Sequence, residues 1–531
     1  MRPKHFVALL AAVFPALFLS TPTSAQNADV SNGHVTLRGH GVGLAPGTVS
    51  STANPQVALY TLTMPLPGSW SVSFGLTTAY GQRTSIQRVD KAGQTASVYV
   101  AGMLPNTTYH MQATITLRDG TVATDSDHTF TTGSLPPGIP ASFPVTLGVT
   151  GTPQPGIELL DSLQTVGSVP STVLATDLQG NVIWTYPFPD RSNGTWLFPA
   201  KLMPNGNFIA FLSPNSYPLD LPGTEMMREF DLAGNTVREL SMADLNTALA
   251  AAKFPVTLAH FTHDVTPLPN GHFLLITNTS RSFTDLPGYP GTTQVVGDVI
   301  VDLDRNWHPV WIWNEFDHLD VNRHPMLFPD WTHTNSIAYS TDDGNFIVSI
   351  RHQNWVVKVD YRDGRGTGDI LWKLGEGGNF TLHGGVDPTD WFYAQHDAEF
   401  LTRKTTGTFT LGIMDNGDDR EFPADVTCGA GNDPPCLYST IQRLQIDEKK
   451  MTATFLFHQI LPSYLYSSWG GSTDNLPNGD VEYDLSDEGP ESQIFEVTDE
   501  STPRMVWNLT TLGSNMYRGY RMPSLYPGVQ W

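Results

Sequence analysis

Three histidines occupy similar positions in a repeating pattern of this 531-residue chain. They lie in the stretches His260-Phe-Thr-His263-Asp264, Asp330-Trp-Thr-His333-Thr-Asn335 and Trp391-Phe-Tyr-Ala-Gln-His396-Asp-Ala-Glu399. Each histidine begins an apolar strand that runs into a glycine turn eight to eleven residues later. Equivalent positions in a repeat predict side chains that point at a common place. We interpret that place as an anion site in which one histidine is a nucleophile.

Two further side chains could bind an anion beside these histidines. Arg351 follows the apolar stretch Phe346-Ile-Val-Ser-Ile350, which belongs to the same repeat as His333. Its guanidinium offers a fork of donors to a tetrahedral oxyanion. Asn335 lies two residues after His333, so it shares a face of the strand and can donate from its amide.

Two kinds of chemistry fit this constellation. Neutral imidazoles could hold a transition metal, with Asp264 or Asp397 as groups that orient the ligands. Arg351 beside three metal ligands would be electrostatically unfavourable, and no carboxylate ligand is evident. Alternatively, the histidines and Arg351 could hold a sulfate or phosphate ester while one imidazole nitrogen attacks, which divides a group transfer into two easier steps.

The elements that must position these residues form an internal repeat from residue 144 onward. A β-hairpin with an aspartate near its turn is expected six times, at 172–184, 227–240, 299–313, 356–372, 441–457 and 494–507. A second hairpin, built on a glycine turn, is expected around Gly206, Gly271, Gly344, Gly407 and Gly479. Two hairpins per unit predict an all-β, six-bladed β-propeller over 144–531, in which residues 144–162 supply the missing hairpin and join the ends. A pair of sandwiches is the alternative, and helical periodicity is limited to Met242–Lys253.

The N-terminal part predicts a separate small module. Residues 30–133 alternate apolar and polar residues between turns, and Leu104-Pro-Asn-Thr-Thr-Tyr109 resembles the tyrosine-corner region of fibronectin type III sandwiches. Residues 134–143 are the linker. Nothing catalytic is expected in this module.

Composition and the first residues bear on location and partners. The net charge of −23 argues against nucleic-acid binding, while a local positive pocket for an anionic small molecule remains possible. Residues 1–25 have the pattern of a secretory signal peptide, so we expect a periplasmic or secreted protein without a membrane span. In that compartment we expect Cys428 and Cys436 to form a disulfide.

Several of these stretches together resemble the bacterial arylsulfate sulfotransferases. They are Asp330-Trp-Thr-His-Thr-Asn-Ser-Ile-Ala-Tyr339, Ser349-Ile-Arg-His-Gln353, Tyr393-Ala-Gln-His396, Asp415-Asn-Gly-Asp-Asp-Arg420 and Ile446-Asp-Glu-Lys-Lys450. The resemblance covers most of the chain, including the exported N-terminal sandwich and the propeller.

The resemblance implies ping-pong transfer of a sulfuryl group from a phenolic sulfate ester to a phenol, without a nucleotide donor or other cofactor. It assigns His396 as the nucleophile that forms a sulfohistidine, and His263, His333, Asn335 and Arg351 as sulfate-coordinating residues. His260 and His272 compete with His263 for its assignment. His352 is expected to point to the opposite face of its strand. The resemblance also implies a homodimer.

Some features depart from the family or compete with this assignment. Family members carry a disulfide loop just before the nucleophilic histidine, whereas residues 379–390 contain no cysteine. The aspartates of 415–419 could bind calcium, but their spacing misses the EF-hand pattern and a turn is the simpler explanation. The rival functions are a metal-dependent hydrolase or lyase on the same scaffold, and a non-catalytic secreted propeller that binds sulfated ligands.

Overall fold

The computed structural model describes residues 28–31, 34–37, 42–149, 151–163, 171–187, 195–214, 225–418, 420, 437–487 and 491–531. Within these ranges the chain is nearly all-β and its sheets are almost entirely antiparallel, as predicted. The 1–25 segment and the Cys428 and Cys436 pair lie outside the described residues. No helix in the described ranges is long and apolar enough to cross a membrane.

The N-terminal part consists of small antiparallel sheets. The first contains β1 (Ala28–Ser31), β2 (His34–Leu37) and β3 (Val42–Leu44). A second contains β4 (Thr48–Ser51), β5 (Ala58–Met64) and β9 (Gln94–Val100). A third contains β6 (Gly68–Gly75), β7 (Gln82–Arg83), β8 (Gln87–Val89), β10 (Thr108–Leu117), β11 (Val122–Thr124) and β12 (His128–Thr131). The Tyr109 hydroxyl accepts a hydrogen bond of 3.0 Å from the Leu104 N–H, the contact that the tyrosine-corner pattern predicts.

Six larger sheets follow, and each contains a meander of four antiparallel strands. The first three are β38-β14-β15-β16 (Asn515–Met522, Ile157–Leu163, Thr172–Thr176, Val182–Thr185), β17-β18-β19-β20 (Thr195–Leu202, Phe208–Pro214, Met226–Phe230, Thr236–Ser241) and β21-β22-β23-β24 (His260–Pro267, Phe273–Leu286, Tyr289–Leu303, Pro309–Asn314). The next is β25-β26-β27-β28 (Thr334–Tyr339, Phe346–Ile350, Trp355–Val359, Ile370–Leu374). The last two are β30-β31-β32-β33 (His396–Phe400, Thr408–Asp415, Thr440–Asp447, Thr452–Ile460) with β29 (Thr381–His383) added in parallel, and β34-β35-β36-β37 (Thr473–Asn475, Val481–Leu485, Gln493–Val497, Met505–Thr510) with β13 (Val145–Leu147) added.

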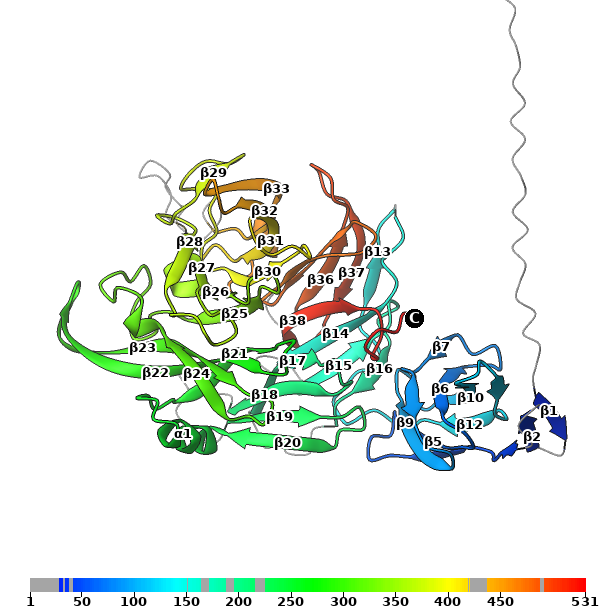
Figure 1. The fold of residues 1–531 in the computed structure, drawn as a ribbon. Coiled ribbons are helices and arrows are strands. Elements are labelled where there is room, and N and C mark those ends of the chain that lie inside the picture. The colour runs from blue at the N-terminus through cyan, green and yellow to red at the C-terminus, as the bar shows by residue number, and fades with distance from the viewer. Residues whose placement is uncertain are drawn as a thin grey trace, which may run out of the picture.

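The six hairpins predicted at aspartate turns and the five predicted at glycine turns are present as antiparallel pairs. The short helices are α1 (Met242–Ala251), where helical periodicity was predicted, and η1 (Glu315–Asp317), η2 (Arg351–Gln353) and η3 (Ser463–Leu465). The first strands of consecutive sheets contact one another from β17 through β21, β25 and β30 to β34, and β38 contacts both β17 and β35. Figure 1 shows these first strands toward the middle of the larger β region.

The joining of the chain ends differs from the prediction. Residues 144–162 do not form one hairpin: β13 pairs with β37 at the outer edge of the last sheet, and β14 pairs with the C-terminal strand β38. The first sheet therefore takes its innermost strand from the end of the chain. The prediction missed this because the two partners are separated by more than three hundred residues and share no local pattern.

The N-terminal sheets pack against the larger β region. The Asn54 side-chain amide donates to the Thr185 carbonyl (2.9 Å), and the Tyr526 hydroxyl donates to the Tyr99 carbonyl (2.8 Å). One apolar core contains Tyr60 and Trp70 on the N-terminal side and Trp184 on the other. Figure 1 shows the N-terminal sheets, in blue, beside β16.

A buried arginine links the first and last of the six sheets. Arg521 on β38 pairs with Glu158 on β14, with Glu482 on β35 (3.2 Å) and with Glu496 on β36 (2.8 Å). All four side chains are nearly inaccessible to solvent. Since a buried carboxylate without its partner is costly, this cluster makes the closure dependent on β38.

We predict that Arg521→Met lowers the unfolding free energy by about 3–5 kcal/mol, because it leaves buried carboxylates unpaired. Burial already raises the pKa of Glu158 and Glu482 above the ordinary value of 4.5. The loss of stability should therefore grow as the pH rises above that value, because the unfolded chain releases these protons more easily than the folded one. Thermal unfolding at a series of pH values measures the effect. Arg504→Met removes a half-exposed pair with Glu500 and serves as the control, expected to cost less than about 1 kcal/mol. Equal losses in the two variants would contradict the structural role of Arg521.

Candidate active site

The three predicted histidines lie on neighbouring first strands. His263 is within β21, His333 immediately precedes β25, and His396 is the first residue of β30. Since β21 contacts β25 and β25 contacts β30, the repeat brings together residues that are far apart in the chain.

The imidazole rings are close to one another and to one tyrosine. The ring centroids of His263 and His333 are 4.5 Å apart. The ring of Tyr517 on β38 lies near both His263 and His396, with centroid distances of 5.9 Å and 6.2 Å. The three imidazoles therefore converge instead of diverging.

His396 is held by an asparagine that the sequence analysis did not single out. His396 Nδ1 lies 2.7 Å from Asn416 Oδ1. The Asn416 amide nitrogen donates to the carbonyls of Ser467 (2.8 Å) and Gly470 (3.2 Å), which fixes the amide so that Oδ1 must accept from His396. The proton of the neutral imidazole is thus on Nδ1, and Nε2 carries the lone pair. The Gly470 N–H donates a hydrogen bond of 3.3 Å to Nε2.

The protein environment keeps His396 and His263 uncharged. Burial, assisted by the Arg351 guanidinium, holds the pKa of His396 well below its usual value. Burial and the neighbouring His333 do the same for the pKa of His263. A buried neutral imidazole with a defined Nε2 lone pair can act as a nucleophile without first losing a proton.

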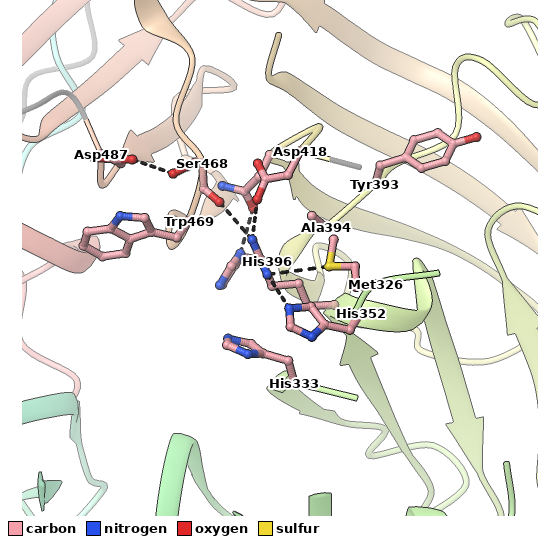
Figure 2. Close-up of polar contacts among 12 residues, drawn as sticks. Met326, His333, His352, Tyr393, Ala394, His396, Asp418, Ser468, Trp469 and Asp487 are labelled. Atoms are coloured by element: carbon pink, nitrogen blue, oxygen red, sulfur yellow. Dashed lines mark hydrogen bonds and ion pairs between the residues drawn. The ribbon is translucent and has the colours of Figure 1, made fainter. Parts of the chain in front are cut away.

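Arg351 extends from η2 into the same group. Its Nη2 pairs with the Asp418 carboxylate and donates to the Ser468 carbonyl (3.1 Å), and only 13% of the side chain is exposed. Asp418 also accepts from the Tyr466 hydroxyl at 2.8 Å. Figure 2 shows His333, His352 and His396 drawn together with Asp418 and Ser468 around these contacts. Arg351 therefore does not face bulk solvent, and an anion would replace or adjoin the Asp418 carboxylate.

His352 does not point away from the site, so that expectation is wrong. Strand alternation ends at Ile350, and the 3₁₀ turn of η2 rotates His352 back toward its neighbours. Its ring centroid lies 4.6 Å from that of His333, and its Nε2 accepts from Arg351 Nη1 at 2.5 Å. Asp330 contributes to the same group, with its Oδ2 2.6 Å from His333 Nδ1.

Asn335 is fully buried beside the histidines. Its amide nitrogen donates to the Gln395 carbonyl at 2.7 Å, one residue before His396. This bond links β25 to the start of β30, so Asn335 fixes the spacing between the strands that carry His333 and His396.

Aromatic and thioether side chains border the polar group. The Phe198 ring lies 4.9 Å from that of Tyr517 and 6.3 Å from that of His263, in edge-on geometry. Met326 Sδ lies 3.9 Å from Arg351 Nη1. These apolar surfaces lie where a ring attached to a bound anion could pack.

The other candidates have different roles. His260 pairs with Glu225 and His272 with Asp302, so neither replaces His263. Asp264 pairs with Lys201 (2.6 Å) and Asp397 with Arg518 (3.0 Å). Asp415 of the acidic turn pairs with Arg420 and accepts from the Tyr393 N–H. The acidic turn is therefore a structural turn that presents Asn416 and Asp418 to the site.

Arg518 is a second residue that the sequence analysis missed. It is fully buried, and its Nη2 donates to the Asn335 carbonyl at 2.6 Å while its Nη1 lies 3.0 Å from Asp397 and 3.8 Å from Asp264. The signal that could have revealed it is the repeated His-Asp pair at 263–264 and 396–397. Two aspartates at equivalent buried positions require a cation between them.

Comparison with known proteins bears on the same region. The family described as Arylsulfotransferase (ASST) matches residues 152–521. The chain is 25% identical over 366 residues to the arylsulfate sulfotransferase AssT of Escherichia coli O6:H1 (strain CFT073), which covers 55% of this chain and 54% of that protein. The match thus spans about half the length of this curated relative.

Similarity to solved structures is weak. A protein described as a putative 6-phosphogluconolactonase, from Bacteroides fragilis, has a TM-score of 0.37 at 10% identity, over 70% of this chain and 99% of that one. The lignostilbene dioxygenase of Pseudomonas brassicacearum has a TM-score of 0.35 at 12% identity, over 90% and 95%. The family match, in contrast, includes every predicted site residue, and this chain belongs to the arylsulfotransferase family.

Proposed function

We propose that this protein transfers a sulfuryl group from a phenolic sulfate ester to a phenol by a ping-pong mechanism through a sulfohistidine at His396. The observation that carries the proposal is the buried, neutral His396, whose Nδ1–H is held by Asn416. Family membership supports sulfuryl transfer as the reaction class.

In the first half-reaction, the Nε2 lone pair of His396 attacks sulfur in line with the departing phenolate. The N–S bond forms, the S–O bond to the aryl group breaks, and the phenolate leaves with that electron pair. Nδ1 keeps its proton, and Asn416 Oδ1 stabilises the positive charge that develops on the ring.

In the second half-reaction, a phenol acceptor takes the place of the first product. Its oxygen attacks sulfur, the N–S bond breaks, and the electron pair returns to Nε2. The proton that the acceptor loses balances the proton that the first phenolate gains, so the overall exchange needs no net acid or base.

Arg351, His263, His333 and Asn335 hold the sulfuryl oxygens in this proposal. Arg351 carries the positive charge, because burial keeps His263 neutral. The Gly470 N–H, 3.3 Å from His396 Nε2, is a further donor within reach of an oxygen on a group attached there. Phe198, Tyr517 and Met326 offer the surface for the aromatic ring.

We also propose a domain organisation, a location and an oligomeric state. The six sheets would be the blades of a β-propeller over 144–531, supported by the contacts between successive first strands. Residues 30–133 would be a fibronectin III-like sandwich and 134–143 the linker. We further propose cleavage of a signal peptide at 1–25, a periplasmic or secreted location, a Cys428–Cys436 disulfide and a homodimer, and we propose no cofactor.

We predict that His396→Asn abolishes exchange between an aryl sulfate and a second phenol, by more than about a thousandfold, because the nucleophile is lost. Mass spectrometry of the wild type with donor alone should detect one added sulfuryl group on His396. His383→Asn, at an exposed position on β29, is the matched control and should retain activity. Donor cleavage without a sulfurylated histidine, or binding without turnover, would favour the hydrolytic or non-catalytic alternative.

We predict that Arg351→Lys lowers kcat/KM for the donor by roughly 10–100-fold, since lysine cannot provide the planar fork of donors. Steady-state kinetics with the donor varied at a saturating acceptor concentration measures this loss. Unchanged kinetics would remove Arg351 from the anion site.

We predict that Asn416→Asp makes phenol release from the donor dependent on pH. A carboxylate beside Nδ1 raises the pKa of His396, so the single-turnover rate should fall as pH decreases from about 8 to about 6, whereas the wild-type rate stays nearly flat because its His396 pKa is lowered. The other titratable or charged groups around His396 are Arg351, His333, His263 and Tyr517, and the substitution leaves them in place.

The matched variant Asn416→Ala separates charge from orientation. It removes the Oδ1 atom that accepts the hydrogen bond from His396 without adding charge. The single-turnover rate should therefore fall at every pH without becoming more dependent on pH. A flat profile in Asn416→Asp would contradict the assignment of Asn416 as the residue that positions His396.

A further inference from the structure

A group of metal-ligating side chains lies next to Arg351, near His396. It consists of Asp330, His333 and His352, whose donor atoms all lie within 4.8 Å of one another. No other set of three or more histidine, cysteine or acidic residues in the described ranges meets this condition. The mechanism proposed above uses His333 but neither Asp330 nor His352.

The donor atoms are close enough together to converge on one ion. Zinc binds nitrogen and oxygen at about 2.0–2.2 Å, so its ligand atoms lie about 3.4 Å apart. Asp330 Oδ2 lies 2.6 Å from His333 Nδ1 and 3.8 Å from His352 Nδ1, and these distances bracket that value. The remaining separation, between the two histidine donors, is within 4.8 Å, so small side-chain rotations could bring three ligands to one ion, with water as a fourth.

The structure answers both objections to a metal that arise from the sequence. Asp330 supplies the carboxylate ligand, which neither Asp264 nor Asp397 can do because they pair with Lys201 and Arg518. The charge of Arg351 is compensated by Asp418. The three side chains are 11–20% exposed, so the group can be reached from solvent.

We propose that Asp330, His333 and His352 form an inhibitory site for a divalent first-row transition ion such as Zn²⁺. Imidazole nitrogen and carboxylate oxygen are suitable ligands for zinc. The inhibitory role rests on the proposed function of this site, whereas the binding of the ion does not.

Inhibition follows from the contact between His352 and Arg351. His352 Nδ1 now carries the proton, which it donates to the Asp330 carbonyl, while Nε2 accepts from Arg351 Nη1. An ion on Nδ1 moves that proton to Nε2, so two donors then face each other and Arg351 must withdraw. The donor ester thereby loses the guanidinium that binds it, and ion and ester exclude each other.

Calorimetric titration of chelator-treated full-length protein with Zn²⁺ alone tests the binding. We expect one ion per chain, and at least about tenfold weaker binding in both His352→Ala and Asp330→Asn, since even changes around a metal's ligands cost that much. His308→Ala is the matched control, because His308 belongs to an exposed pair with Asp304 and should leave the affinity unchanged. Circular dichroism checks that each variant is folded.

The outcomes separate the two claims. Absence of binding, or wild-type affinity in both triad variants, would overturn the site, and this result does not depend on any sulfotransferase activity. In the kinetic arm, Zn²⁺ should raise the apparent KM for the aryl sulfate without lowering kcat, and a chelator should reverse the effect. Binding at the triad with unchanged kinetics would overturn the inhibitory role. Absence of transfer in the metal-free enzyme would count against the proposed function alone.

Discussion

The candidate site depends on one buried cation. Arg518 lies on the last strand of the chain, yet its guanidinium contacts Asp264 on β21, Asn335 on β25 and Asp397 on β30, the three strands that carry or adjoin the histidines. Burial opposes ionisation of Asp397, and Arg518 counteracts it. Since an unpaired charge at this depth is costly, β38 helps to hold the three strands in position. Closure of the fold and assembly of the site are therefore coupled through Arg518.

Local backbone geometry allows one residue to face the histidine site while its neighbour in the chain pairs with Arg518. His263, His333 and Asp397 all have φ values near +50°, and the ladders of β21, β25 and β30 shift register at or beside these positions. A bulge breaks the simple alternation of a strand and redirects a side chain. His396 can thus contact Asn416 while Asp397 contacts Arg518. This strained geometry is maintained by the ion pairs of Asp264 and Asp397 with Arg518 and by the packing of His263 against His333.

Much of this fold could be predicted from the sequence, because hairpin turns and apolar alternation are local signals. The convergence of the three histidines followed from their common place in the repeat. The missed features depend on contacts that no local pattern encodes: β38 completes the first sheet, and Asn416 reaches His396 from a turn between strands. The orientation of His352 was mispredicted because strand alternation was applied beyond the end of β26. Prediction succeeded where a residue follows the repeat, as the three histidines do, and failed where its position depends on a turn or on a distant partner.

The proposed chemistry relies on neutral imidazoles and on one guanidinium whose charge is compensated by Asp418. If His396 were paired with a carboxylate, its ring would be protonated more readily, and the positive charge on a sulfurylated ring would be more strongly stabilised. The Asn416 carbonyl fixes the same tautomer but stabilises the developing positive charge less, so in the proposed mechanism the sulfuryl group would pass readily to the acceptor. Reversible exchange between two similar phenols needs an intermediate that is neither much more nor much less stable than the esters on either side. An amide partner in place of an acid meets that requirement.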